Sequence, residues 1–177
     1  KILLAAYNLK ILTSRDLGIL DVKETGKSFK ENSLIKAKSV PDNYLTISDD
    51  SGLCVNSLGG KPGIFSSRFQ KECGGWFEAM ERIYSDVKTT KTEDFSAKFI
   101  CCLSIKFSKN LIYSYFGEIK GKIVWPPRGI NGFGYDPFFI PKGHAKTFAE
   151  MEHSNKIFID HRSIALKKLI KLHLSDS

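Results

Sequence analysis

The sequence predicts an α/β fold with a mixed, twisted central sheet flanked by helices. Apolar segments typical of strands alternate with segments rich in helix-forming residues, as in α/β proteins. Two strand-like segments in the middle, "FSAKFICCLSIKF" and "NLIYSYFGEIKGKIV", flank a short polar turn over 108–110, which indicates a hairpin. A hairpin inside an alternating chain favours a mixed sheet over a purely parallel one.

The first half of the chain opens on a short apolar strand and continues with a helix that Pro41 ends. The segment "YLTISDDSGLCV" predicts a strand, a polar break and a second short strand. Gly and Pro punctuate "SLGGKPGIFSSRF", which predicts a loop. The first strand and the helix are expected over 2–6 and 28–40.

The second half contains a helix in "GGWFEAMERIYSDV", whose apolar residues recur at helical spacing and are expected to face the core. The Gly- and Pro-rich "WPPRGINGFGYDPFFIP" predicts a long loop. An amphipathic helix in "DHRSIALKKLIKLHL" follows, with Asp160 as the expected N-cap. The core-facing set of the first helix is Trp76, Phe77, Met80, Ile83, Tyr84 and Val87.

Length and composition are those of one cytoplasmic domain over 1–177, with 42% hydrophobic and 26% charged residues. No apolar run approaches the roughly 18 residues of a membrane span, and "KILLA" is too short for a secretory signal. The four cysteines form no CxxC pair, so we expect reduced thiols. The net charge of +8 favours anionic ligands, but surface solubility explains it equally well.

Asp49 and Asp50 stand side by side where the first part of the "YLTISDDSGLCV" segment is expected to end. A solvated turn is the simple interpretation, and a carboxylate for a metal ion or a water is the functional one. Neighbouring strand residues point to opposite faces, so we expect one aspartate to enter a cleft and the other to support the loop. Ligands of open α/β sheets collect beyond strand ends, which favours Asp50, followed by Ser51 and Gly52, as the ligand-facing residue.

Two further segments concentrate functional side chains. "NGFGYDP" supplies Phe133 or Tyr135 to stack on a planar base and Asp136 to accept hydrogen bonds, although a purely structural loop explains the same residues. "DHRS" places His161 and Arg162 in the first turn of a helix, where cations oppose the helix dipole. That arrangement favours an anionic or electron-rich ligand there, with solvated basic residues as the alternative.

These segments, in this order, resemble the inosine triphosphate pyrophosphatase family, which hydrolyses deaminated purine nucleoside triphosphates. The matching motifs are "SDDSGLCVNSLGGKPGIFSSRF", "NGFGYDPFFIP", "KTFAEM" and "NKIFIDHRSIALKKL", with weaker matches in "KILLAAYN" and "ETGKSFKENSLIKAK". The family opens on Thr-Gly-Asn-x-x-Lys, of which only Asn8 is kept here. The family's phosphate-binding Lys and its first-helix acid have no counterpart, and the acidic stretch after Phe69 is shorter.

The resemblance implies Mg²⁺-dependent attack of water near the α-phosphorus of ITP, dITP or XTP, which yields the monophosphate and pyrophosphate. It implies that Asp50 is the general base or a metal ligand and that Glu24 is a second metal carboxylate. It also implies a homodimer. The implied substrate-binding residues are Asn8, Lys36, Ser51, Phe133, Gly134, Tyr135, Asp136, Lys156, His161 and Arg162.

Two other functions remain open from the sequence. One is a Maf-like nucleotide pyrophosphatase with another base preference, against which "GFGYDP" and "HR" argue. The other is a basic, non-catalytic nucleic-acid-binding domain, which the charge of +8 and the missing phosphate-binding Lys support. No helix-turn-helix pattern, RNP-like aromatic strand or Arg cluster is present, so we expect neither a specific nucleic acid nor a membrane partner.

Overall fold

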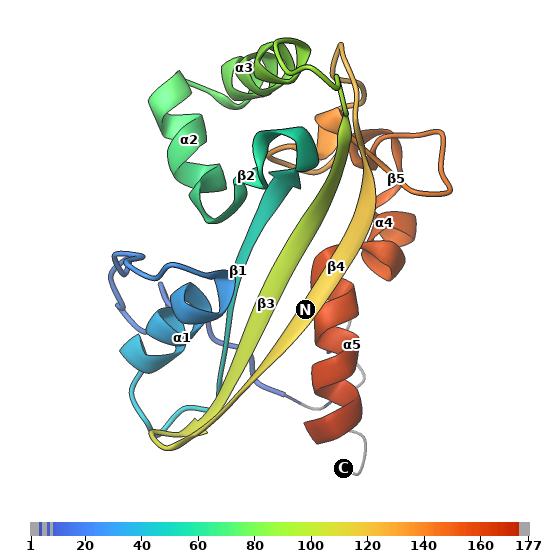
Figure 1. Cartoon of the computed structure of the whole chain (residues 1–177). Helices are drawn as coiled ribbons and strands as arrows, with labels where there is room; N and C mark the ends of the chain where they lie inside the picture. Colours follow the sequence, from blue (N-terminus) through green and yellow to red (C-terminus); the bar gives the residue numbers. More distant parts are fainter. Residues whose placement is uncertain (1–3, 5–6, 8, 174–177) are drawn as a thin grey trace.

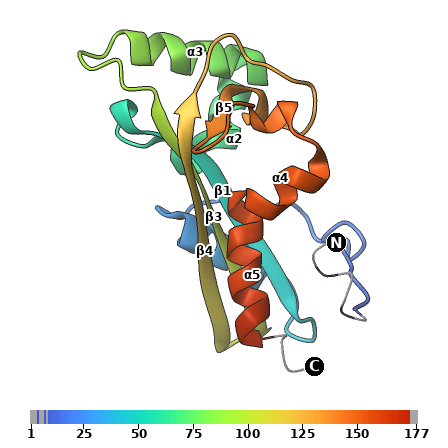
Figure 2. The same cartoon turned by 90° about the vertical axis from the view of Figure 1, so that its right-hand side faces the viewer.

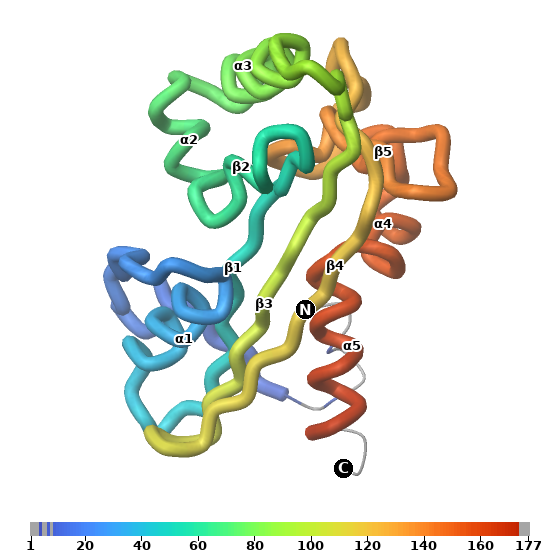
Figure 3. Tube along the Cα trace, in the orientation of Figure 1, coloured from blue at the N-terminus to red at the C-terminus, as the bar shows by residue number. Residues whose placement is uncertain are grey.

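A five-stranded antiparallel sheet forms the centre of the computed structural model, which describes residues 4, 7 and 9–173 (Figure 1). Its strand order is β2-β1-β3-β4-β5. The β3–β4 hairpin turns at Lys109 and Asn110, as the sequence predicts, and runs nearly the whole length of the molecule (Figure 3). The strands are β1 (Thr46–Val55), β2 (Lys61–Pro62), β3 (Ser96–Ser108), β4 (Leu111–Ile123) and β5 (Phe139–Pro141).

The helices divide between the two faces and the upper end of the sheet. Helix α1 packs on one face, and α5 lies along the other (Figures 1 and 2). Helices α2 and α3 lie at the end of the sheet where β1 meets β2 (Figure 1). Their bounds are α1 (Phe29–Ser39), α2 (Ser66–Cys73), α3 (Trp76–Lys88), α4 (His153–Ile159) and α5 (His161–His173).

The predicted α/β class, with a central sheet flanked by helices, is confirmed. A mixed sheet was expected, but among the described residues every strand pair is antiparallel. Helix α1 and the hairpin match their predictions closely. Asp160 caps α5 as predicted, because its side chain accepts a hydrogen bond from the Ser163 N–H at 2.7 Å. The strand predicted over 2–6 falls largely outside the described residues, and so does Asn8.

The predicted break at Asp49 and Asp50 is wrong, because β1 is continuous through both. The strand tolerates two adjacent charges because its neighbouring side chains face opposite sides, where each carboxylate has its own partners. The two aspartates therefore lie within a strand and not beyond its end.

Two helices were missed by the sequence analysis. The segment predicted as a loop contains the start of α2, which ends at Gly74 in the left-handed conformation. Helix α4 was also missed, since its seven residues are too few for a clear apolar period. Helix α3 was predicted correctly, except that Phe77 is 54% exposed.

The main core lies between the upper sheet, α3 and the loops around β5. It contains Leu53, Val55 and Phe99 from the sheet. A smaller apolar cluster of Leu103, Ile105 and Leu169 seats α5 on the lower sheet. Gly52, on the opposite face of β1, has no side chain because a Cβ there would lie 2.1 Å from the Gly63 carbonyl oxygen. This close contact holds the segment before α2 against β1, two residues after Asp50.

In the described part of the chain, no helix is both long and apolar enough to span a bilayer. All four cysteines are free thiols, as predicted, and three of them are buried.

Candidate active site

Asp49 and Asp50 project from opposite faces of β1. Asp50 pairs with Cys102 across the sheet, on the face that contacts α1, whereas Asp49 pairs with Leu103, on the face that contacts α5. Each carboxylate organises a different group of polar residues. We call these the Asp50 cluster (Glu24, Asn32, Lys36, Asp50 and Arg68) and the Asp49 cluster (Asp49, Ser51, Phe133, Asp136, Lys156, His161 and Arg162).

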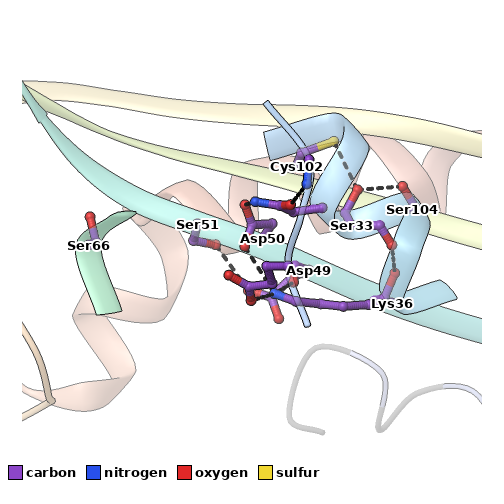
Figure 4. Close-up of polar contacts among 12 residues, drawn as sticks. Ser33, Lys36, Asp49, Asp50, Ser51, Ser66, Cys102 and Ser104 are labelled. Carbon is purple, nitrogen blue, oxygen red and sulfur yellow. Dashed lines mark hydrogen bonds and ion pairs between the residues drawn. The ribbon is translucent and has the colours of Figure 1, made fainter. Parts of the chain in front are cut away.

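The Asp50 carboxylate is buried, with 5% of the residue exposed, and both of its oxygens are bonded. Asn32 donates to Oδ2 at 3.2 Å and Lys36 donates to Oδ1 at 3.0 Å. The Lys36 Nζ also lies 2.7 Å from Glu24 Oε1 and donates to the Asp49 carbonyl oxygen at 2.9 Å. One ammonium therefore joins Glu24 to Asp50, and Figure 4 shows Lys36 reaching from α1 to the two aspartates of β1.

Helix α1 is fixed against the sheet by hydroxyl contacts, and this places Asn32 and Lys36. Ser28 caps its N-terminus by accepting from the Glu31 N–H at 3.1 Å. Ser33 and Ser104 are joined by a buried hydrogen bond of 2.6 Å (Figure 4). Ser48 donates to the Ser33 carbonyl at 2.7 Å. These contacts bind the helix to two strands, so Asp50 and its partners keep a fixed spacing.

Burial and charge act in opposite directions on the Asp50 cluster. Burial raises the pKa of the Asp50 carboxyl above its ordinary value, although the Lys36 ammonium opposes this rise. Burial acts to lower the pKa of Lys36, but the hydrogen bonds and charges of Glu24 and Asp50 outweigh it and raise that pKa. Lys36 therefore stays charged between the two carboxylates, and the Asp50 carboxyl accepts a proton more readily than an exposed aspartate.

Asn32 and Arg68 belong to this cluster but were not predicted from the sequence. Asn32 has no exposed surface, and its Oδ1 accepts from the Gly26 N–H at 2.8 Å, which fixes its amide toward Asp50. Arg68 comes from α2 and stacks over the Phe65 ring at 4.4 Å. The motif "SSRF" was matched as a segment, but only the fold shows that its Arg faces Glu24. No local pattern marks either residue.

The Asp49 cluster begins on the other face of β1. Asp49 Oδ2 accepts from the Ser51 hydroxyl at 3.0 Å and from Arg162 Nε at 3.2 Å. Arg162 extends from the first turn of α5, so this ion pair joins the helix to the strand. Both side chains are about 40% exposed, at 43% for Asp49 and 39% for Arg162. This side of β1 is more open to solvent than the Asp50 side.

An exposed phenylalanine between two cations continues this cluster. The Phe133 ring is 62% exposed, with Lys156 Nζ 5.4 Å and Arg162 Cζ 5.3 Å from its centre. The buried Asp136 accepts from the Phe133 N–H at 2.8 Å and from Lys156 Nζ at 2.6 Å. Gly132 leaves room for the Asp136 carboxylate, since a Cβ at position 132 would lie 2.1 Å from Asp136 Oδ2.

His161 lies beneath Arg162 and is only 2% exposed. Its ring stacks on Phe99 with 4.7 Å between centres, and Arg162 Nη1 donates to its Nε2 at 3.1 Å. Its Nδ1 is buried and has no hydrogen-bond partner among the described residues. Burial lowers the pKa of His161 well below its usual range, and the charges of Arg162 and Lys156 lower it further. The ring is therefore neutral and supports Arg162.

Tyr135 belongs to the main core, and Gly134 faces the Trp76 ring, whose nearest atoms would lie 3.6 Å from an added Cβ. Tyr135 is 3% exposed, packs edge-on against Trp76, and donates to the Ser66 carbonyl at 3.3 Å. Of the two aromatic side chains of "NGFGYDP", Phe133 is thus the one exposed to solvent. Asn8 lies outside the described residues.

A metal ion would find two carboxylates in the Asp50 cluster. Within residues 4, 7 and 9–173, no group of three or more His, Cys, Asp or Glu residues is placed to hold one. Two carboxylates nevertheless suit Mg²⁺, which commonly takes one or two from a protein and completes its shell with water and phosphate oxygens. Glu24 and Asp50 both direct an oxygen at the same Lys36 nitrogen, so their spacing fits a shared cation.

Comparisons with known proteins find relatives over nearly the whole chain. The family model described as the Ham1 family matches residues 1–172. A dITP/XTP pyrophosphatase of Zymomonas mobilis is 38% identical, covering 95% of this chain and 82% of that protein. One from Bacillus subtilis is 39% identical, covering 94% and 84%. The structure of a HAM1 protein from Coxiella burnetii superposes with a TM-score of 0.89 at 32% identity, covering 99% of this chain and 91% of that one.

Proposed function

The chain belongs to the Ham1 family, and from this membership we propose that it is a Mg²⁺-dependent pyrophosphatase of deaminated purine nucleoside triphosphates. Its substrates would be dITP, ITP and XTP, and its products the nucleoside monophosphate and pyrophosphate. The relatives named dITP/XTP pyrophosphatase support this reaction. The observation that carries it is the pair of carboxylates, Glu24 and Asp50, around one cation position on β1.

Glu24 and Asp50 would hold the metal ion. When bound, Mg²⁺ supplies neutralising charge for the phosphate oxygens of the substrate. Lys36 contributes a second positive charge from α1 and Arg68 a third from α2. Together these groups stabilise the negative charge that collects on the pyrophosphate as it departs.

Asp50 would accept the proton of the attacking water. Beside the bound cation the buried Asp50 carboxylate would stay ionised, which leaves it able to take up a proton. Asn32 holds the other Asp50 oxygen, so the carboxylate keeps one orientation during the reaction. Ser51, the next residue along β1, turns its hydroxyl to Asp49 on the opposite face, where it would help to hold Asp49 beside Arg162.

The Asp49 cluster would recognise the base. The Phe133 ring offers a stacking surface, and Lys156 and Arg162 offer donors beside it. Hypoxanthine and xanthine carry a 6-oxo acceptor where adenine carries an amino donor. Lys156 and Arg162 would therefore donate hydrogen bonds to hypoxanthine and xanthine but not to adenine. A site whose donors are left unpaired rejects adenine. His161 and Asp49 would orient Arg162, and Asp136 would orient Lys156.

We further propose a cytoplasmic homodimer that uses no nucleic-acid partner. The free thiols agree with a reducing compartment.

The proposed function is tested by measuring pyrophosphate release from dITP, XTP, dATP, dGTP and dTTP, with Mg²⁺ and with EDTA. We expect rapid release from dITP and XTP with Mg²⁺ only, and slow release from dATP and dTTP. Guanine shares the 6-oxo group, so slow release from dGTP would require exclusion through its 2-amino group. A preference for dTTP would favour the Maf-like alternative. No hydrolysis, together with salt-dependent binding to a random oligonucleotide, would favour the nucleic-acid-binding alternative.

A further inference from the structure

The Lys36 ammonium is surrounded by three oxygens from two separate segments. Its Nζ lies 2.7 Å from Glu24 Oε1, 3.0 Å from Asp50 Oδ1 and 2.9 Å from the Asp49 carbonyl oxygen. An ammonium has three N–H donors, so each has an acceptor. A protein cation therefore fills the space between the two carboxylates suited to a divalent cation.

We propose that Lys36 is an exchangeable counter-ion, whose ammonium neutralises Glu24 and Asp50 in the free protein and moves to the substrate's phosphates when a divalent cation binds. The inference rests on the proposed function, since it takes the same two carboxylates as cation ligands. It goes further in giving Lys36 two positions and in making metal and phosphate binding depend on each other.

The two cations exclude each other from this position. Mg²⁺ requires its oxygen ligands at about 2.0–2.1 Å, which brings the carboxylates closer together than an ammonium does. An ammonium and a divalent cation that share the same oxygens also repel each other strongly at such a short distance. Binding of the metal ion therefore requires Lys36 to withdraw from at least one carboxylate.

Lys36 is free to withdraw, as a comparison with Lys106 shows. The Lys36 side chain is 29% exposed and its carboxylate partner Glu24 is 27% exposed, so both border solvent. Lys106 also contacts the end of α1, but its side chain is 1% exposed and is held by the Val40 carbonyl and by Asp42. A flexible stem that ends in solvent permits a second position, whereas full burial does not.

Arg68 independently indicates an anion beside these carboxylates. Its Nε and Nη2 are buried and have no hydrogen-bond partner within the described residues. The nearest carboxylate oxygen in an ion pair with it, Glu24 Oε2, lies 4.0 Å from Nη2, which is too far for a hydrogen bond. Buried donors without acceptors are destabilising, and phosphate oxygens would satisfy them. The same phosphates would provide the second partner of Lys36.

The test measures metal binding without catalysis. MnCl₂ is titrated into the free protein by calorimetry and electron paramagnetic resonance, with and without inorganic tripolyphosphate. We expect weak Mn²⁺ binding to the wild-type protein and an increase of at least tenfold with tripolyphosphate, which is within the usual range of coupling between sites. Mn²⁺ should strengthen tripolyphosphate binding by the same factor.

Lys36→Met removes the competing ammonium while keeping the apolar stem. Its free form should bind Mn²⁺ about tenfold more tightly than the wild-type protein, and tripolyphosphate should add less to that affinity. Its melting temperature in EDTA should fall, because two neighbouring carboxylates lose their counter-ion, and Mn²⁺ should restore it. Lys38→Met makes the same charge change on the exposed side of α1. It should change neither the Mn²⁺ affinity nor the melting temperature in EDTA.

Unchanged or weaker Mn²⁺ binding by folded Lys36→Met overturns the proposal, as does tight wild-type binding that tripolyphosphate leaves unaltered. If Lys36→Met fails to fold, the effect of tripolyphosphate on Mn²⁺ binding to the wild-type protein still tests the proposal. Lys36→Gln provides a second variant. A protein that hydrolyses dITP but lacks the coupling contradicts only the exchange of Lys36. A protein that releases no pyrophosphate contradicts the proposed function itself.

Discussion

The two faces of β1 place adjacent aspartates, Asp49 and Asp50, in different surroundings. On one face, Asp50 is buried and shares a cation with Glu24. On the other, Asp49 is 43% exposed and positions an arginine beside an exposed aromatic ring. The first arrangement suits charge neutralisation, and the second suits recognition of a planar, hydrogen-bonding base. The roles proposed for the two aspartates therefore follow their burial and not their residue type.

Neutralising one aspartate at a time tests whether the two faces of β1 differ in function. Asp50→Asn should lower kcat for dITP roughly 10²–10⁴-fold, the usual contribution of a positioned general base. Asp49→Asn should cost much less, because it only loosens Arg162. Turnover of both variants is measured with Mg²⁺, with melting temperature as a check on folding. Comparable losses in the two variants would contradict the division of roles.

Arg162→Ala tests the base-reading face by itself. It should lower kcat/KM for dITP by roughly tenfold or more, since a hydrogen bond to a charged group contributes about 1.5–3 kcal/mol. The already low activity on dATP should stay near its starting value, so the ratio of the two substrates should collapse. If both substrates weaken equally and the ratio survives, Arg162 binds phosphate and does not read the base.

Neutral His161 should make stability depend on pH. Its pKa is lowered in the folded protein, so below about pH 6.5 the unfolded chain binds a proton that the folded one does not. The free energy of unfolding should therefore fall with decreasing pH, by at most about 1.4 kcal/mol per pH unit from this group. His161→Gln should flatten the dependence measured by urea unfolding between pH 7.5 and 5.5. His153→Gln, at an exposed position, should leave the slope unchanged.

Reduction is expected to have the smallest effect. All four cysteines are free, and burial raises the pKa of the Cys54 and Cys101 thiols to about 11 and about 12, so both stay protonated and unreactive. Activity on dITP and melting temperature should not change with or without reductant. A large loss of stability on reduction would contradict the free-thiol state.

The sequence predicted the elements whose patterns are local. The apolar period of α3, the capping of α5 by Asp160 and the hairpin turn are all visible within a few residues. The alternation rule also predicted that Asp49 and Asp50 separate. The interruption of β1 was predicted wrongly because the partners that make its charges tolerable, Lys36 and Arg162, lie far away in the chain.

In the candidate site, too, contacts between distant segments could not be predicted from local patterns. Motif resemblance selected Glu24, Lys36 and Arg162, and the fold places each beside an aspartate of β1. Asn32 and Arg68 escaped prediction because their contacts join segments that only folding brings together. The burial of Tyr135 likewise depends on packing against Trp76, a residue of a distant segment.

The continuity of β1 limits how this chain can vary in evolution. Asp49 and Asp50 are consecutive residues, so their Cα atoms stay about 3.8 Å apart in any conformation of the surrounding loops. An insertion or deletion of one residue upstream within β1 would shift its register against β3 and turn each carboxylate to the opposite face. Length changes can accumulate in the loops between elements, but the ten residues of β1 can change only by substitution. The strand thereby fixes the distance between the Asp49 cluster and the Asp50 cluster.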